Sequence, residues 1–209
     1  MPEYKLMYFP IRGRGQAIRL LMLDQGVEFQ ESTIAFKEWP TLKATLAFGQ
    51  CPVFYVDGET LVQSNTILRY LGKQCGLYGS TDMEAAYIDM LNDGVEDAYS
   101  RYLKMIYNDY ENGKDDYVTK VLPTWLASFE KWLATKADGK AFLMGEKISY
   151  VDYNFFQFLD AQQILSSTCL DNLPLIKAYY ERMAARPKLS EFLKSETNTK
   201  RNVNGNGKQ

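Results

Sequence analysis

The sequence contains no histidine, and that absence removes a large part of enzyme chemistry. A histidine-based catalytic triad, a histidine general base and a histidine metal site are all excluded. Acid–base catalysis must therefore fall to tyrosine, aspartate, glutamate, lysine or cysteine side chains.

Cysteine is scarce as well. The three cysteines are Cys51, Cys75 and Cys169; they are widely spaced, and none forms a C-x-x-C pair. An odd number at such spacing argues against a disulfide framework and against a zinc ribbon. The default expectation is a reducing compartment.

An excess of positive charge is also missing. The formal net charge is −2 and the isoelectric point is about 5.4, so no chain-wide basic field exists to attract nucleic acid or an anionic membrane. No apolar run approaches the roughly 20 residues of a membrane-spanning helix. The first residues, MPEYKLMYF, lack the apolar core of a signal peptide. We therefore expect a cytoplasmic protein that binds neither nucleic acid nor membrane.

The chain does have the length and apolar content for real cores, with 209 residues of which 46% are hydrophobic. Its first part alternates between strand and helix patterns. Strands are expected at 5–9, 27–35, 51–56 and 59–62, the last two as a hairpin, and helices at 16–26, closed by Gly26, and at 64–76, with Ser64 as N-cap. This order predicts an α/β unit with a mixed sheet.

After a linker at 77–82, the pattern becomes helical. Helices are expected at 85–110, then, after a break at 111–116, around Pro123 in 117–137, and at 174–185, where Arg186-Pro187 ends the segment. Ser149 and Asp152 predict a capping box, with Ile148 and Tyr153 as a hydrophobic staple. The polar tail, NTKRNVNGNGKQ, is by default a loose terminus.

The run GRGQAI at 13–18 looks like a dinucleotide-binding fingerprint cut short. Ile18 stands where the third glycine should be, and no acidic ribose-binding residue follows in a suitable place. The glycines therefore favour a tight strand-to-helix turn over a nucleotide site. Two helix starts, after residue 15 and at Ser64, remain good anion sites.

Several features stay open on the residues alone. The Cys51–Pro52 bond could be cis, which would turn the Cys51 backbone toward an extended peptide, or an ordinary trans bond in a loop. Tyr8, at the end of the first strand, fits core packing. The acidic run NDGVED at 92–97 fits a solvated face, and Leu103 and Tyr107 fit a core stripe of the same helix.

Taken together, longer motifs carry a resemblance that spans the whole chain in order. They are YFPIRGR, FGQCP, LVQSNTILRYLG, NDGVEDAYSRYLKMIY, YENGKDDYV, ISYVDYN and NGNGKQ. With these motifs, the chain resembles a cytosolic glutathione S-transferase of the pi class.

The resemblance implies a thioredoxin-like N-terminal domain at 1–78, with a mixed four-stranded sheet, and an all-helical domain at 83–209, working as a homodimer. It implies conjugation of the glutathione thiol to small hydrophobic electrophiles, a detoxification reaction. Glutathione is then a co-substrate, and neither a metal nor another cofactor is needed.

The same resemblance assigns the site residues. Tyr8 would be catalytic, because its hydroxyl donates a hydrogen bond to the thiolate, the nucleophilic form. Glutathione would be bound by Arg14, Trp39, Lys43, Gln50, Cys51, Pro52, Gln63, Ser64 and, from the neighbouring subunit, Asp97. The electrophile pocket would comprise Phe9, Ile11, Phe36, Leu103, Tyr107 and Gly205, with the tail folded over it.

The sequence also departs from the family pattern. The loop WPTLK at 39–43 is short, Cys51 stands where a larger apolar residue is common, and Thr45 falls near a usual loop cysteine. Phe48 occupies the place of the dimer key aromatic, usually tyrosine. Two alternatives are a non-catalytic glutathione-binding or scaffold protein on the same fold and a sigma-like glutathione-dependent isomerase.

Overall fold

The first part of the chain forms the predicted mixed sheet, as seen in a computed structural model that describes residues 2–136 and 140–209. The strands are β1 (Tyr4–Tyr8), β2 (Gln30–Thr33), β3 (Val53–Val56) and β4 (Glu59–Val62), in the order β2-β1-β3-β4. β1 runs parallel to β2 and antiparallel to β3, and β4 pairs antiparallel with β3. The buried face of β1 carries Tyr4, Leu6 and Tyr8, so alternation along the strand aims Tyr8 inward.

Helical segments lie between these strands and after the last of them. They are the 3-10 turn η1 (Gly13–Gly15), α1 (Gln16–Gln25), α2 (Trp39–Lys43) and α3 (Ser64–Gln74). Gly26 closes α1 with a φ of 70°, as predicted. The N-cap of α3 is Gln63, with a φ of 72°, so the prediction of Ser64 was wrong by one residue. The left-handed backbone at Gln63 turns the chain out of β4, and Ser64 is already helical. The segment 39–43, expected as a loop, is the helix α2.

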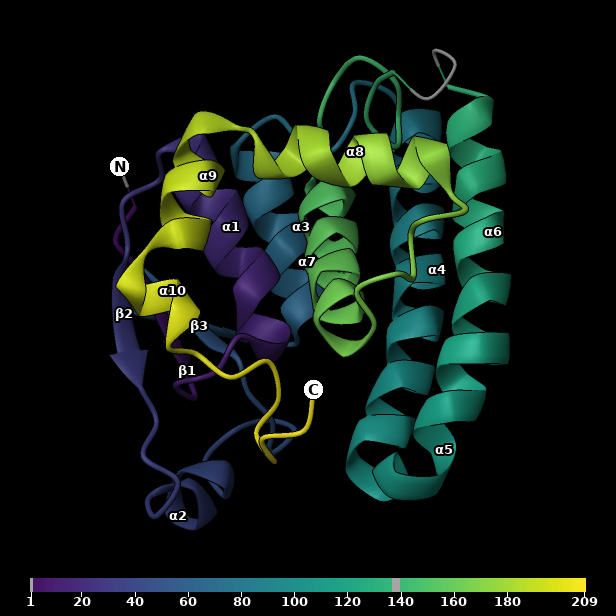
Figure 1. The fold of residues 1–209 in the computed structure, drawn as a ribbon. Coiled ribbons are helices and arrows are strands. Elements are labelled where there is room, and N and C mark those ends of the chain that lie inside the picture. The colour runs from purple at the N-terminus through teal and green to yellow at the C-terminus, as the bar shows by residue number, and fades with distance from the viewer. Residues whose placement is uncertain (1, 137–139) are drawn as a thin grey trace.

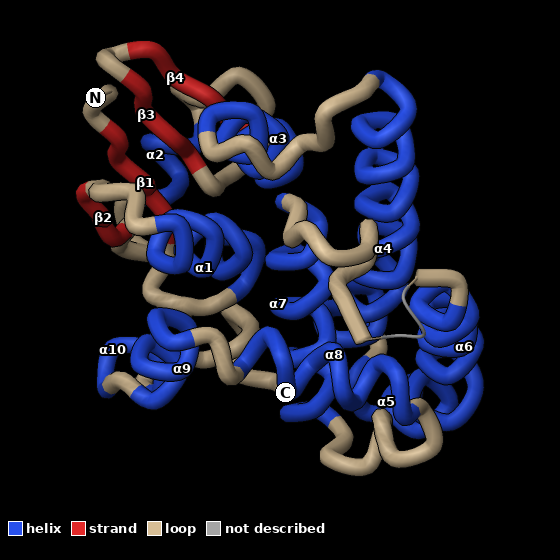
Figure 2. Tube along the Cα trace, turned by 90° about the horizontal axis from the view of Figure 1, so that it is seen from above, coloured by secondary structure: helices blue, strands red, loops and turns tan. Residues whose placement is uncertain are grey.

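The second part of the chain is helical in the residues that the structure describes (Figure 1). Its elements are α4 (Asp82–Asn108), α5 (Tyr110–Asp116), the π-helical turn η2 (Tyr117–Val121), α6 (Leu122–Ala134), α7 (Tyr150–Leu165), α8 (Pro174–Ala184), α9 (Pro187–Lys194) and α10 (Glu196–Thr199). α7 lies at the centre and packs against α1, α3 and α4 (Figure 2). It therefore joins the helical part to the helices that cover the sheet.

The expected break at 111–116 was wrong. Only Asp109 leaves the helical conformation, with φ −151° and ψ 43°, and the chain re-enters a helix at Tyr110. Pro123 sits in the first turn of α6, where its missing N–H costs nothing. The end of the expected helix, at residue 137, lies outside the described residues.

The predicted capping box of α7 is present. Asp152, which is fully buried, accepts the Ser149 N–H and hydroxyl, both at 2.7 Å, and the Leu143 N–H at 2.9 Å. These bonds tie the loop before α7 to its first turn, which is a structural role. The staple between Ile148 and Tyr153 stays a prediction.

The C-terminal tail is not loose, as the residues alone suggested, but returns from α10 toward the middle of the molecule (Figure 1). The carbonyls of Asn202 and Val203 accept the N–H groups of Arg12 and Gly13, at 2.9 and 3.0 Å. Val203 and Asn204 are 2% and 1% exposed. The tail therefore packs on the turn between β1 and α1. Among the helices described, none is long and apolar enough to cross a membrane.

Candidate functional site

A cavity of about 460 Å³ brings most of the predicted glutathione-binding residues together. Its predicted lining residues are Arg14, Trp39, Gln50, Cys51, Pro52, Gln63 and Ser64, and Leu103 of the predicted electrophile pocket also lines it. Gly49, Asn65 and Glu96 complete the wall. The cavity therefore lies between the loops of the sheet domain and one face of α4.

Backbone groups form one side of this cavity. The Cys51–Pro52 peptide is cis, which settles the alternative left open by the sequence. Next to it, α3 begins at Ser64, so the free N–H groups and positive end of the helix dipole face the cavity. Gln63 Nε2 donates to Gln50 Oε1 at 2.9 Å and joins the two loops. This side suits an extended peptide with a carboxylate at the helix start.

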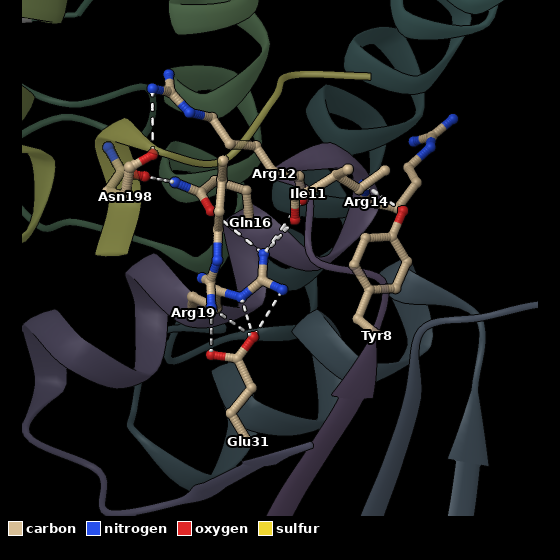
Figure 3. Close-up of polar contacts among 9 residues, drawn as sticks. Tyr8, Ile11, Arg12, Arg14, Gln16, Arg19, Glu31 and Asn198 are labelled. Carbon is tan, nitrogen blue, oxygen red and sulfur yellow. Dashed lines mark hydrogen bonds and ion pairs between the residues drawn. The ribbon is translucent and has the colours of Figure 1, made fainter. Parts of the chain in front are cut away.

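Tyr8 does not line the cavity itself but contacts Arg14, which does. Its side chain is 6% exposed, and its Oη accepts the backbone N–H of Arg14 at 3.0 Å (Figure 3). Burial raises the pKa of Tyr8 well above the usual phenol value, while the Arg14 hydrogen bond opposes that shift in part. The hydroxyl therefore keeps its proton at neutral pH. With the Arg14 N–H occupying one lone pair, that proton is available to donate outward.

The two glycines of η1 let the turn approach the Tyr8 ring. A Cβ at Gly13 would lie 2.6 Å from Tyr8 Oη, and one at Gly15 would lie 2.6 Å from Tyr8 Cδ1. Gly13 also has a φ of +39°. The prediction of turn glycines is confirmed, and the reason is close packing against an aromatic ring.

Arg14 is held by two residues of α4 that sequence reasoning missed. Its guanidinium forms an ion pair with Glu96 and lies 4.0 Å from the centre of the Tyr99 ring. Glu96 also accepts a hydrogen bond from Asn154 Nδ2 at 3.0 Å. The acidic run 92–97, expected to be a solvated face, thus contributes a carboxylate to the cavity. No local pattern could have revealed a partner 82 positions away.

The predicted electrophile residues form two groups. In the first, Phe9 stacks on Phe36 at 4.8 Å between ring centres and meets Trp39 edge-on at 5.2 Å. In the second, the Gly205 N–H donates to Tyr107 Oη at 3.0 Å, and a Cβ at Gly205 would lie 3.7 Å from Ile11 Cδ1. Phe36 and Tyr107 are 57% and 50% exposed, so Tyr107 is not a core residue.

Two of the predicted glutathione-binding residues do not line this cavity. Lys43 lies beside it, with its Cγ and Cε 3.2 Å from where a Cβ would stand at Gly49. Asp97 lines a different cavity, of about 350 Å³, with Ser100, Arg101, Lys104 and Trp125. A single chain therefore does not bring Asp97 to the predicted glutathione site.

The cysteines and acidic residues show no metal chemistry within the part of the chain that the structure describes. No group of three or more metal-ligating side chains occurs among the described residues. The three cysteines are free thiols. Burial raises the pKa of Cys51 to about 12, so this thiol is protonated at neutral pH although it lines the cavity.

Comparison with known proteins agrees with this architecture. The family described as "Glutathione S-transferase, N-terminal domain" matches residues 4–73, and "Glutathione S-transferase, C-terminal domain" matches residues 96–196. Glutathione S-transferase P of Bos taurus is 47% identical over 211 aligned residues, which cover 100% of both chains.

Solved structures give the same result. The pi-class glutathione S-transferase of Onchocerca volvulus has a TM-score of 0.96 at 45% identity and covers 99% of this chain and 100% of its own. A prostaglandin synthase D of Nilaparvata lugens has a TM-score of 0.82 at 31% identity, over 93% of this chain and 98% of its own.

A mixed four-stranded sheet beside an all-helical part, with a cavity between them, is thus the architecture of a thioredoxin-like transferase fold. The chain belongs to the glutathione S-transferase family. Within it, the full-length similarity lies with the pi class.

Proposed function

We propose that the protein conjugates the thiol of glutathione to small hydrophobic electrophiles, with the Tyr8 hydroxyl stabilising the thiolate. The observation that carries this proposal is the state of that hydroxyl. It is buried, it stays protonated, and it already accepts the Arg14 N–H, so it is prepared to donate a hydrogen bond toward a sulfur in the cavity.

The chemistry follows from the pKa of a thiol. A free thiol has a pKa of about 8.5, so little thiolate exists at neutral pH. A hydrogen bond from Tyr8 favours the charged sulfur, and lowering its pKa by about 2 units corresponds to about 2.7 kcal/mol. The thiol proton leaves to solvent. The thiolate then forms a C–S bond with the electrophile, and the leaving group departs with its electron pair.

The other glutathione contacts are proposed from the cavity wall. The glutamyl carboxylate would lie at the start of α3, with the Ser64 N–H and hydroxyl and with Gln63. The cysteinyl part would pair with the backbone of Cys51, which Pro52 and Gln50 flank. The glycyl carboxylate would meet Trp39 and Lys43, and Arg14 would lie beside the sulfur.

The electrophile would occupy the side that bears the two groups of predicted electrophile residues. Phe9, Phe36 and Leu103 offer apolar surface, and Tyr107 is exposed next to Ile11 and Gly205. We further propose a division into domains at 1–78 and 83–209 and a cytoplasmic location, which suits three free thiols.

A homodimer would complete the site. Asp97 faces away from the cavity of its own chain, so its predicted contact with the glutathione ammonium requires a second subunit. Phe48, 67% exposed, is available to fill a pocket of that partner.

Of the two alternatives, neither gains support. The family and its full-length relatives are named as transferases, and the structure named as a prostaglandin synthase is less similar than the pi-class structure. A scaffold protein would not need a buried, protonated tyrosine at the cavity.

The decisive test is a spectrophotometric conjugation assay with glutathione and a chloronitrobenzene, comparing wild type with Tyr8→Phe. We expect kcat to fall about 100-fold, the equivalent of about 2.7 kcal/mol, while glutathione affinity changes little. Because burial raises the pKa of Tyr8, the neutral-pH rate profile should report the bound thiol, and its apparent pKa should rise in Tyr8→Phe. Equal rates in the two proteins would remove Tyr8 from the mechanism. Tight glutathione binding without conjugation of any electrophile would favour the scaffold.

The dimer contact has its own test. Asp97→Asn should raise the KM for glutathione about tenfold, because an ammonium loses a charged partner. A monomer forced by Phe48→Asp should show the same rise. A monomer that keeps full activity would exclude the contact across subunits.

A further inference from the structure

An ion triad with one buried member, Arg19, connects the two ends of the chain. Arg19 on α1 is 1% exposed, and its Nε and Nη2 both lie 2.7 Å from Oε1 of Glu31 on β2 (Figure 3). Arg201, which follows α10, places Nη2 3.0 Å from each oxygen of the same carboxylate. Glu31 thus joins two guanidinium groups, one from the first helix and one from the C-terminal tail.

Arg19 and the tail that begins at Arg201 both contact the turn at 11–13. Arg19 Nη1 donates to the carbonyls of Ile11 and Arg12, at 2.9 and 3.3 Å. On the other side, the N–H groups of Arg12 and Gly13 donate to the tail, as described above. The next N–H along the chain, that of Arg14, donates to Tyr8 Oη. The turn is therefore held at its carbonyls by α1 and at its N–H groups by the tail.

Arg201 sits immediately before the tail residues that pair with the turn. Ile11 and Asn202 form a parallel β-bridge, and three residues further on the Gly205 N–H donates to Tyr107 Oη. A slip of the tail by one residue would exchange the carbonyls offered to the turn and would move Gly205 away from Tyr107. The anchor of Arg201 on Glu31 is thus placed where it fixes this register.

The three charges differ in what their removal would do. Loss of Glu31 would strand the buried guanidinium of Arg19, which endangers the fold. The Arg201 side chain is partly exposed, at 14%, and its loss leaves the Arg19–Glu31 pair in place. Arg201 is therefore the member that can be changed without unpairing Arg19, whose guanidinium lies 5.7 Å from the centre of the Tyr8 ring.

We propose that Arg201 is a positioning residue for the electrophile site. Acting through Glu31, it sets the register in which the tail meets the turn at 11–13, and so places Gly205 against Tyr107. This proposal rests on the proposed function, in which Tyr107 and Gly205 meet the electrophile. The proposal predicts that the tail affects electrophile binding but not glutathione binding, because the wall at Cys51 and Ser64 does not contact the ion triad.

The test compares Arg201→Leu with Lys200→Leu in the conjugation assay. Lys200 is a matched control, because it carries the same charge in the same segment but pairs with exposed Glu196. For Arg201→Leu we expect the KM for the chloronitrobenzene to rise about fivefold, the size of one partly exposed charged hydrogen bond. The KM for glutathione should stay within about twofold of wild type. The apparent pKa of the bound thiol should change by no more than about 0.3 units. Lys200→Leu should match wild type. Arg201→Lys should restore the electrophile KM, because a single nitrogen contacts both Glu31 oxygens.

Amide hydrogen exchange by mass spectrometry, on the same full-length proteins, gives a readout that does not depend on catalysis. In Arg201→Leu, peptides that contain 11–13 and 202–205 should exchange faster, while the α3 peptide stays unchanged. Unchanged exchange and kinetics would overturn the proposal, and so would equal effects in Lys200→Leu. A joint loss of glutathione affinity and thermal stability would reduce Arg201 to a structural residue. If wild type conjugates nothing, the proposed function fails, and the exchange pattern alone decides whether Arg201 fixes the tail.

Discussion

The two sides of the cavity are built differently. The side proposed for glutathione comes from the loop at 49–52 and from the start of α3 at 63–65, and it presents backbone groups and a helix start. The side proposed for the electrophile gathers residues from the loops that follow β1 and β2, from α4 and from the last residues of the chain, and of these Leu103 lines the cavity itself. Tyr8 contacts a residue of each side: its Oη accepts the Arg14 N–H, and its ring meets the Phe9 ring edge-on at 6.0 Å between centres.

The difference has a physical consequence. Backbone groups keep their positions when a side chain changes, because local turns and strand pairing hold them. A wall of side chains depends on contacts between distant segments, such as the Gly205–Tyr107 hydrogen bond and the Arg201–Glu31 ion pair. Substitution should therefore alter electrophile binding more readily than glutathione binding, except at Tyr8 and the turn that supports it.

The largest effect should come from Gly15→Ala, because Gly15 packs against the ring of Tyr8. The new methyl group would stand 2.6 Å from Tyr8 Cδ1 and 2.9 Å from Cγ, so either the ring or the turn must move. Because catalysis depends on the place of the Tyr8 hydroxyl, we expect kcat/KM to fall about 100-fold with every electrophile. Steady-state kinetics with two electrophiles of different size measures this.

Gly94→Ala is the matched control for that substitution. Gly94 lies inside α4, and an added Cβ would make ordinary contact with Phe129 at 3.7 Å. We expect unchanged kinetics and a gain of about 0.5–1 kcal/mol in the free energy of unfolding. If Gly15→Ala also left the kinetics unchanged, the close packing of Gly15 against Tyr8 would not contribute to catalysis.

Local sequence signals predicted two helix ends correctly and a third wrongly. The C-cap at Gly26 and the capping box of Ser149 and Asp152 depend on residues within one turn, and both are present. The N-cap of α3 failed because Gln63 adopts a positive φ that a non-glycine side chain rarely takes. Propensity alone could not indicate that conformation.

Contacts between residues that lie far apart in the sequence could not be predicted from local patterns. Glu96 was expected in a solvated face, because nothing near it in sequence shows that Arg14 packs against α4. The tail was expected to be loose because it is rich in Asn and Gly. Composition does not indicate the backbone hydrogen bonds that it makes with residues 12 and 13. Tyr8 was assigned to the core by residue type, and it is indeed buried. The role proposed for its hydroxyl could not be predicted from residue type, because it depends on the hydrogen bond from Arg14 in the neighbouring turn.

A smaller effect, confined to the electrophile side, should come from Phe36→Ala. Phe36 is mostly exposed and stacks on Phe9, so its loss removes apolar surface without opening the core. Stacked aromatic pairs contribute about 0.5–1.5 kcal/mol, which corresponds to a rise of about 2- to 12-fold in the KM for the chloronitrobenzene. The KM for glutathione should not change.

Phe36→Leu serves as the control, because it keeps apolar bulk but loses the stacking and should give an intermediate value. A rise in the glutathione KM equal to the rise in the electrophile KM would show that the two sides are not separate at this point.

The smallest effect should come from Cys51→Ala, on the glutathione side. The side chain changes, but the N–H and C=O groups proposed to pair with glutathione remain, so the KM for glutathione should stay within about twofold. Ser64→Ala, in the same wall, removes a hydroxyl proposed to contact the ligand and should raise that KM about fivefold. Since burial raises the pKa of Cys51 to about 12, the thiol should also react slowly with iodoacetamide at pH 7.5. If Cys51→Ala weakened glutathione binding more than Ser64→Ala, the side chain and not the backbone would form this wall.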